Sequence, residues 1–181
     1  KSKFALLKHG TFWLSETPEK PSTGWDAALN RIVTWGIFKS KKTEKEFMVF
    51  NTHFDHVGVE ARKNSATLIR EKIEEMVPAG TPVILTGDFN LTPDQKPIEM
   101  LREYLDDSYE VSKEPPYGPV GTYNGFNLNS DLDRRIDYIF VKGDLEELNF
   151  KEKPFDTKIN AELQNKKIEK STKDKISNEK I

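Results

Sequence analysis

VILTGDFNLTP, residues 83–93, runs from an apolar segment through a glycine to Asp88 and Asn90. A nearly unbroken apolar run of this length is typical of a β-strand that is covered on both faces. In layered α/β folds, ligands bind beyond the carboxyl ends of such strands, because side chains there project from a rigid support. The stretch therefore predicts a layered α/β domain with Asp88 and Asn90 at one edge of its sheet.

The segments around this strand predict alternating strands and helices. Apolar and β-branched runs bounded by polar turns favour strands, and apolar residues spaced three or four apart favour helices. The expected elements are strands at 31–38, 46–54 and 134–143, a helix from about Val59 to Val77 with Ala66, Ile69 and Ile73 on its apolar face, and a second helix at 97–105. Residues 113–133 are expected to form a long loop, and loops of this length in a compact domain are often functional.

Composition limits the class of protein and of substrate. The 181 residues, 35% of them hydrophobic, suffice for one domain with a sizeable core. No segment approaches the roughly 20 apolar residues of a membrane span, so none is expected. The absence of cysteine excludes disulfides, thiolate metal sites and a cysteine nucleophile. Residues 151–181 carry +3 and residues 1–150 carry −5, and an acidic body favours a compact phosphorylated substrate over long DNA.

The end of the chain has a different composition from the rest. Residues 160–181 contain no proline, glycine or aromatic residue and are rich in lysine. Such a segment buries little apolar area. We therefore expect a domain at 1–153 and a lysine-rich tail, helical or disordered, at 154–181. The sequence begins at Lys1 without an initiator methionine, which leaves localisation open between the cytoplasm and export with a signal outside this sequence.

Two groups of polar residues follow two predicted strands. His53, Asp55 and His56 follow one of them, and Asp88 and Asn90 follow the other. Because Asp88 and Asn90 are two residues apart, their side chains point to the same side of an extended chain. Carboxylate and amide oxygens are hard ligands that suit Mg²⁺ or Mn²⁺, and His53 can donate a hydrogen bond to a phosphoryl oxygen. This combination predicts metal-assisted hydrolysis of a phosphate ester.

Arg62 is predicted to join this site from the first turn of the helix. It extends the apolar face of that helix towards the end of the strand that carries His53, where a guanidinium can hold a substrate phosphate.

Each of the candidate site residues also has a purely structural interpretation. Asp88 and Asn90 can stabilise a turn, His53 can be a hydrogen-bonded structural histidine, and Arg62 can form a salt bridge. For Asp55 and His56 we prefer a structural role at the helix entry.

Six blocks of the sequence together resemble the endonuclease/exonuclease/phosphatase superfamily, in particular bacterial proteins similar to deadenylase and nocturnin-type nucleases. The blocks are TFWLSETP, GWDAALNRIVTW, FNTHFDHVG, ILTGDFNLTP, PPYGPVGTYNGF and RRIDYIFV, and the resemblance runs from about Phe4 to Val141. It implies a four-layered α/β sandwich, in which two mixed β-sheets lie face to face with helices outside. It also implies cleavage of phosphoester bonds with a divalent metal, usually Mg²⁺.

The resemblance assigns roles to individual residues. His53 matches the histidine that hydrogen-bonds the scissile phosphate, and Asp88 the aspartate that acts on the attacking water or the leaving group. Asn90 matches the asparagine that holds phosphate and metal, so that Asp88 and Asn90 are the implied metal ligands. Asp137 matches the aspartate that orients a second histidine. Asn124, in the GTYNGF block, is a further candidate for binding the substrate phosphate.

The sequence departs from the family pattern at both ends. The initial strand with an asparagine and the following segment with a metal-binding glutamate have no counterpart, and the fold is therefore expected to be incomplete. The terminal SDH segment has none either, since no histidine follows His56. Two hypotheses result. The chain belongs to a divalent-metal phosphohydrolase, or it is an inactive remnant that at most binds phosphorylated ligands or a complementary fragment.

The expected partners follow from the same features. They are a phosphorylated small molecule or a short nucleic acid, and a second copy of the chain bound through exposed sheet edges. A nucleic-acid-binding module, with YNGF and the three tryptophans stacking on bases, is a weaker alternative because the body of the chain is acidic.

Overall fold

A computed structural model describes residues 3–127, 129–130 and 132–145. The predicted tail at 154–181 lies outside these residues, as does the predicted domain boundary at 153. The elements, in chain order, are β1 (Phe4–Trp13), β2 (Ile32–Ser40), β3 (Glu46–His53), α1 (Val59–Met76), β4 (Val83–Asp88), α2 (Lys96–Arg102), β5 (Asp106–Asp107), α3 (Ser108–Val111) and β6 (Asp137–Lys142). None of the described helices is long and apolar enough to cross a membrane.

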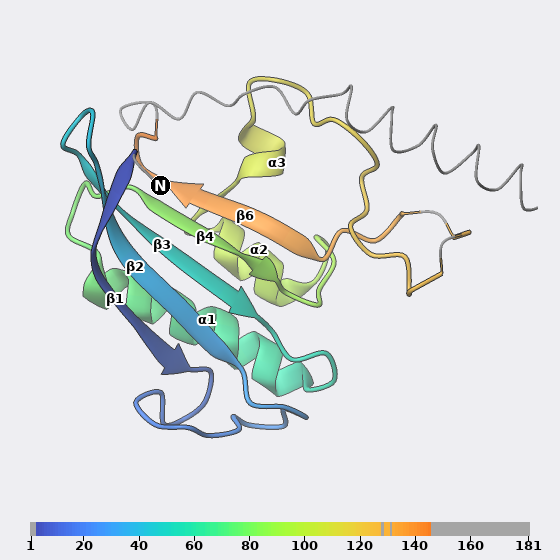
Figure 1. Cartoon of the computed structure of the whole chain (residues 1–181). Coiled ribbons are helices and arrows are strands. Elements are labelled where there is room, and N and C mark those ends of the chain that lie inside the picture. Colours follow the sequence, from blue (N-terminus) through green and yellow to red (C-terminus); the bar gives the residue numbers. More distant parts are fainter. Residues whose placement is uncertain (1–2, 128, 131, 146–181) are drawn as a thin grey trace, which may run out of the picture. The chain divides into compact units, whose positions relative to one another are not determined.

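The strands form one mixed six-stranded sheet in the order β1-β2-β3-β4-β6-β5 (Figure 1). Only β3 and β4 run parallel, and α1 connects them, as a parallel pair requires. All other neighbouring strands are antiparallel. The carboxyl ends of the central strands β3 and β4 therefore lie side by side, next to the amino end of β6.

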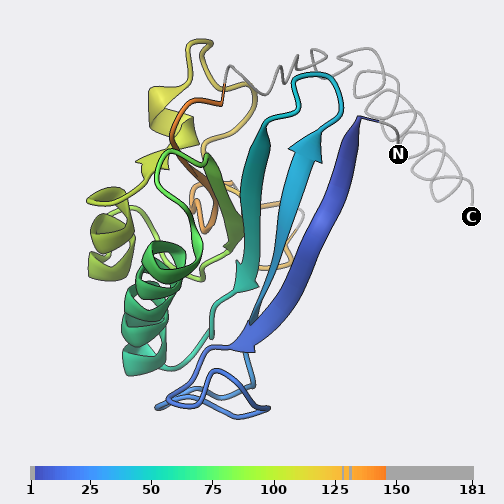
Figure 2. The ribbon, with the colours of Figure 1, turned by 90° about the vertical axis from the view of Figure 1, so that its left-hand side faces the viewer.

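Helices α1 and α2 cover one face of this sheet (Figure 2). In the part of the chain that the structure describes, no helix or strand covers the opposite face, which we call the open face. The mixed sheet with its helices confirms the predicted α/β class. The described residues form one of the two sheets of the predicted sandwich together with its helical layer.

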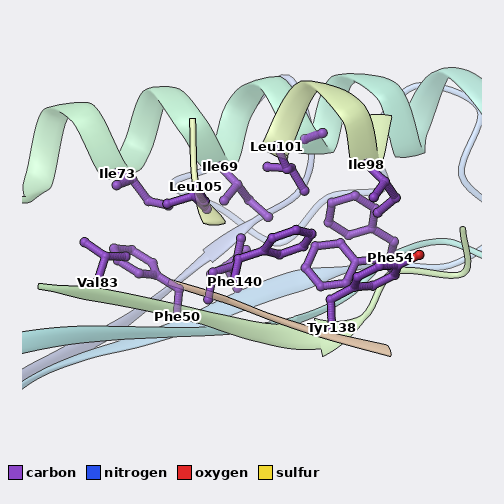
Figure 3. Packing of buried hydrophobic residues seen from close by; sticks show 14 of the residues in the cluster. Phe50, Phe54, Ile69, Ile73, Val83, Ile98, Leu101, Leu105, Tyr138 and Phe140 are labelled. Atoms are coloured by element: carbon purple, nitrogen blue, oxygen red, sulfur yellow. The ribbon is translucent and has the colours of Figure 1, made fainter. Parts of the chain in front are cut away.

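The core fills the space between the sheet and the two helices (Figure 3). Phe50, Leu85 and Phe140 project from three adjacent strands and are fully buried. They face the apolar stripe of α1, which contains Ile69 and Ile73 as the sequence predicts. The apolar stripe of α1 stabilises the fold only when it is removed from water. Packing against the buried side chains of the sheet does this and holds the helix in its position.

The open face changes character along the strands. At one end it carries phenylalanine rings, with Phe47 5.4 Å from Phe4 and 5.6 Å from Phe38 between ring centroids. Further along, it carries Asn51 and Thr86, whose amide nitrogen and hydroxyl oxygen are 2.7 Å apart. The face is thus apolar at one end and becomes polar towards the carboxyl ends of β3 and β4.

Two differences from the predicted elements have local causes. Strand β1 has no counterpart among the predicted elements, because a β-bulge between Leu6 and Lys8 interrupts the alternation of side chains along it. Strand β6 begins at Asp137, three residues later than predicted, because Arg135 turns into the core instead of pairing in the sheet. Its guanidinium forms two hydrogen bonds to the buried Asp107 carboxylate, of 3.1 and 2.8 Å, and ties β6 to the short β5–α3 segment.

Candidate active site

Three of the predicted site residues form a row across the open face. The register of the sheet pairs His53 of β3 with Asp88 of β4, and Asp88 with Asp137 of β6. Residues paired in this way lie on the same face of a sheet. The nearest ring nitrogen of His53, Nε2, is 3.4 Å from Asp88 Oδ2. We call His53, Asp88 and Asp137 the polar row.

Asn90 joins Asp88 through a tight turn after β4. Its backbone N–H donates to Asp88 Oδ1 at 2.8 Å, which leaves Oδ2 of that carboxylate next to His53. Asn90 has a φ of 51°, a left-handed conformation that asparagine adopts more readily than most residues. Its Nδ2 donates to the Phe54 carbonyl at 3.0 Å. The amide oxygen of Asn90 has no donor among the described residues, so it is available to a ligand.

The residue between Asp88 and Asn90 fixes the turn to the core. Phe89 is fully buried, and its ring centroid lies 4.8 Å from that of Phe54 and 5.4 Å from that of Phe140. Backbone hydrogen bonds hold the same segment on both sides, from Phe54 N to Asp88 O and from Phe89 N to Ile136 O, each 2.8 Å. The sequence DFN therefore places one polar group on each side of a buried anchor.

Asp137 is held from the loop at 113–133. The hydroxyl oxygen of Thr122 accepts hydrogen bonds from the backbone N–H groups of Ile136, at 3.1 Å, and of Asp137, at 3.2 Å. The Asp137 residue is exposed, and its carboxylate has no ion-pair partner among the described residues. Asn124 lies in the same loop, where its Oδ1 accepts from Phe126 N at 3.0 Å. The structure places Asn124 in a turn of this loop and records no contact between it and the polar row.

Arg62 lies where the helical spacing predicts, on the first turns of α1. Its Nη1 donates to the carbonyl of Asp55 at 3.3 Å, just beyond the end of β3. No carboxylate lies within salt-bridge distance of Arg62 in the described ranges. The structure therefore brings Arg62 to the loop after β3 and does not place it in contact with His53.

The sequence and the fold both identify relatives of this chain. The model of the Endonuclease/Exonuclease/phosphatase family matches residues 6–154. This chain belongs to that family. The resemblance seen in the sequence is thereby confirmed, and members of the family are phosphoric ester hydrolases.

Individual family members show how much of the molecule is shared. The mannosyl-6-phosphatase Bt3783 of Bacteroides thetaiotaomicron is 46% identical, with a TM-score of 0.74, over 78% of this chain and 54% of its own. An uncharacterized protein of Acanthamoeba polyphaga mimivirus is 40% identical over 43% of this chain and 30% of its own length. The human nocturnin catalytic domain is 19% identical, with a TM-score of 0.57, over 78% of this chain and 49% of its own, and shares the fold. The chain thus spans about half the length of these solved family members.

The polar row and Asn90 provide some of the oxygen ligands that a hard divalent cation requires. Asp88 and Asp137 supply carboxylates from adjacent strands, and Asn90 supplies an amide oxygen, which are the ligand types that Mg²⁺ prefers. Within the described residues, however, no group of three or more histidine, aspartate or glutamate side chains is arranged to hold a metal. The described part of this family member therefore offers an incomplete ligand set.

Asp55, for which the sequence predicts a role at the helix entry, is a buried carboxylate. It is 1% exposed, and its oxygens accept from the backbone N–H groups of Leu29, Val57 and Gly58 at 3.2, 2.9 and 2.7 Å. Val57 and Gly58 directly precede α1, so a role at the helix entry is part of what Asp55 does. It also holds the loop at 14–31 against the turn after β3, two residues from His53.

A second aspartate at the same place was not predicted. Asp26, in the loop at 14–31, accepts from the backbone N–H groups of Glu60, at 3.2 Å, and Ala61, at 2.6 Å. It caps the amino terminus of α1 from a residue far away in the sequence, and sequence rules for caps consider only neighbouring positions. The block GWDAALN contains this residue, but nothing in its local spacing indicates the contact.

Replacing Asp55 with asparagine should lower stability by about 2–3 kcal/mol near neutral pH, because the amide nitrogen cannot accept from these N–H groups. Burial by itself raises the pKa of the Asp55 carboxyl, but the backbone N–H groups of Gly58, Val57, Ala28 and Leu29 outweigh it and hold the pKa well below its usual range. The stabilisation is therefore complete above about pH 4 and decreases as the pH falls further. Urea unfolding at pH 7 and pH 3 should show a smaller acid loss in the variant, and equal losses would contradict this role.

Proposed function

We propose that this chain carries part of the active site of a divalent-metal-dependent phosphohydrolase that cleaves a phosphate ester by in-line attack of water. The observation that supports it best is the alignment of His53, Asp88 and Asp137 across β3, β4 and β6. Three strands of one sheet hold an imidazole and two carboxylates on the same face. Backbone hydrogen bonds of the sheet fix their spacing, as a preorganised site requires.

Each residue has a proposed role at the reacting phosphate. His53 donates a hydrogen bond to a phosphoryl oxygen. Asp88 and Asn90 would hold Mg²⁺ or Mn²⁺, and Asp88 also orients the attacking water or protonates the leaving group. The cation would supply charge stabilisation and a more acidic water. Asp137 places a second carboxylate beside Asp88, and Asn124 and Arg62 remain candidates for contacts to substrate phosphate.

The substrate proposed is a phosphorylated small molecule or a short nucleic acid. The acidic body of residues 1–150 disfavours long duplexes. A family member that is 46% identical is described as a mannosyl-6-phosphatase, which supports a compact phosphate ester. The exposed edge of β1 and the apolar end of the open face also make self-association a proposed property, and light scattering that shows only monomer would contradict it.

A non-catalytic domain that binds phosphorylated ligands or a complementary fragment is the second candidate. All three histidines of these 181 residues lie at or before position 56, so this part of the chain does not supply the histidine that Asp137 would orient. Without such an acid–base group the rate is expected to fall by about 10²- to 10⁴-fold. This candidate is favoured for the chain by itself if the chain folds but does not turn over.

The assay that separates the two uses the purified chain with a chromogenic phosphodiester and a phosphomonoester, each with Mg²⁺, with Mn²⁺ and with excess EDTA. The phosphohydrolase proposal expects turnover that requires the added metal and returns when EDTA is saturated with it. Turnover that is equal with and without EDTA would contradict metal dependence. A cooperative thermal transition with no turnover under any condition would favour the non-catalytic domain.

A further inference from the structure

Three basic side chains from separate segments meet around Asp55. Arg31 directly precedes β2, His56 follows β3, and Arg62 belongs to α1. Arg31 Nε lies 3.6 Å from Asp55 Oδ1, and Arg31 Nη2 lies 3.3 Å from His56 Nδ1. Arg62 Nη1 lies 3.3 Å from the Asp55 carbonyl oxygen. We call Arg31, His56 and Arg62 the basic cluster.

Asp55 pairs with part of the basic cluster, with its Oδ1 3.6 Å from Arg31 Nε and 3.9 Å from His56 Nδ1, but the nearby carboxylates leave donors of the cluster without a hydrogen bond. The Asp55 carboxylate accepts from backbone N–H groups of the loop at 14–31 and of the turn before α1, and Asp26 accepts from two at the start of α1. The Nε atoms of Arg31 and Arg62 are buried and have no hydrogen-bond partner in the described part of the chain. A buried donor without a partner in a native structure calls for an explanation, and the binding of an ion is a common one.

The contact with Arg31 also determines how His56 presents its proton. A guanidinium only donates hydrogen bonds, so the contact with Arg31 corresponds to the ring tautomer in which Nδ1 accepts and Nε2 carries the proton, although Nδ1 also lies 3.9 Å from Asp55 Oδ1. The His56 side chain is 52% exposed. His56 Nε2–H has no acceptor among the described residues, so it can donate to a ligand from the rim of the cluster.

The basic cluster lies close to the polar row but is distinct from it. Asp55, around which the cluster is built, is two residues beyond His53, a separation of at most about 7 Å along the chain. Asn90 donates to the carbonyl of Phe54 and Arg62 to the carbonyl of Asp55, which are consecutive peptide groups. The two places are thus neighbours along the backbone, and the proposal requires a ligand whose two anionic groups span the interval between them.

We propose that the basic cluster binds a second phosphoryl group of the substrate, beside the phosphate that the polar row receives. A phosphoryl group offers several acceptor oxygens to donors from different directions, and guanidinium groups bind it with charge-assisted hydrogen bonds. The assignment of this ligand to the substrate depends on the proposed function. The anion site itself depends only on the contacts around Asp55.

Phosphate binding to the folded chain tests the site without any turnover. The ring protons of His9, His53 and His56 can be assigned in NMR spectra by single substitution of each histidine with glutamine. Inorganic phosphate is then added in EDTA at constant ionic strength. The His56 signals should shift along a saturable curve, and the His9 signals, from β1, should stay in place. Shifts confined to His53 would place phosphate at the polar row alone and overturn the proposal.

A pair of matched variants tests the contribution of the cluster. Arg62→Gln should weaken phosphate binding at least about tenfold, as expected for the loss of one charge-assisted interaction. Arg70→Gln removes the same charge from the same helix, where Arg70 pairs with Glu74 at 3.0 Å, and should leave binding unchanged. Equal weakening in both variants would indicate non-specific attraction and reject the site. If Arg62→Gln does not fold, the shifts of the unmodified chain decide.

The two proposals can fail separately. Saturable phosphate binding at His56 in a chain that hydrolyses no ester would reject the proposed function and retain the anion site. Metal-dependent hydrolysis without a response of His56 to phosphate would do the reverse.

Discussion

Replacing Asp88 with asparagine is expected to lower the rate of phosphoester hydrolysis by about 10²- to 10⁴-fold. Asp88 stands between His53 and the Asn90 turn, and its Oδ2 is the carboxylate oxygen nearest to the histidine. Asparagine has the same shape and its amide oxygen can still accept from Asn90 N, so the turn should persist. What is lost is the negative charge, which both a divalent cation and a proton-transfer step require.

The control for Asp88→Asn is Asp94→Asn. Asp94 follows the same strand at a short distance, and its carboxylate accepts from the Thr92 hydroxyl at 2.6 Å, outside the polar row. This variant should keep its rate within about twofold, as is usual for a substitution that touches neither substrate nor metal. Similar losses in the two variants would show that Asp88 has no special role.

A second measurement makes the Asp88 prediction independent of turnover. Mn²⁺ is paramagnetic, and a bound ion broadens the NMR signals of groups close to it. Because His53 Nε2 is 3.4 Å from Asp88 Oδ2, the ring signals of His53 should broaden when Mn²⁺ is added to the chain and should broaden much less in Asp88→Asn. Equal broadening in both proteins would remove Asp88 from the proposed metal ligands.

Replacing Gly87 with alanine is expected to lower the free energy of unfolding by at least about 3 kcal/mol. A Cβ atom at this position would lie 2.1 Å from the carbonyl oxygen of Thr52, and the residue has a φ of 155° that side-chain-bearing residues rarely adopt. Strand β4 lies in the interior of the sheet between β3 and β6, so it cannot move away from Thr52 without breaking ladder hydrogen bonds.

Gly36→Ala is the matched control, in strand β2 of the same sheet. There the nearest atoms to a new Cβ are the ends of two side chains, at 2.9 Å in Phe38 and 3.0 Å in Leu6, which can rotate away. Thermal unfolding should show a fall of about 10 °C or more in Tm for Gly87→Ala and a few degrees at most for Gly36→Ala. A Gly87→Ala protein as stable as the control would mean that the β3–β4 pairing is looser than the structure shows.

The elements that could be predicted are those whose signal is local. Strand β4 and helix α1 each contain a continuous apolar pattern of the correct period, and both were predicted at nearly their observed positions. Polar residues at the ends of two predicted strands indicate one site, and the parallel pairing of β3 with β4 places His53 opposite Asp88. The bulge in β1 removed the same kind of signal from that strand.

The contacts that could not be predicted are made between segments far apart in the chain. Thr122 supports the backbone of Asp137, and Asp26 caps a helix that begins more than thirty residues later. Arg31 contacts His56, 25 residues further along the chain. Short polar side chains of this kind occur at many positions in any sequence, and only the packed fold selects which backbone groups they reach. The sequence thus located the polar row but not the residues that support it.

The sheet itself sets the distances within the polar row. Neighbouring strands are about 4.8 Å apart wherever their backbones pair, so substitutions on the surface or in the connecting segments leave that interval unchanged. Loops 14–31 and 113–133, by contrast, carry no ladder and can change length and composition freely. Descendants of one ancestral gene can thus acquire different substrate preferences by remodelling these loops, while inheriting the same arrangement of reactive groups.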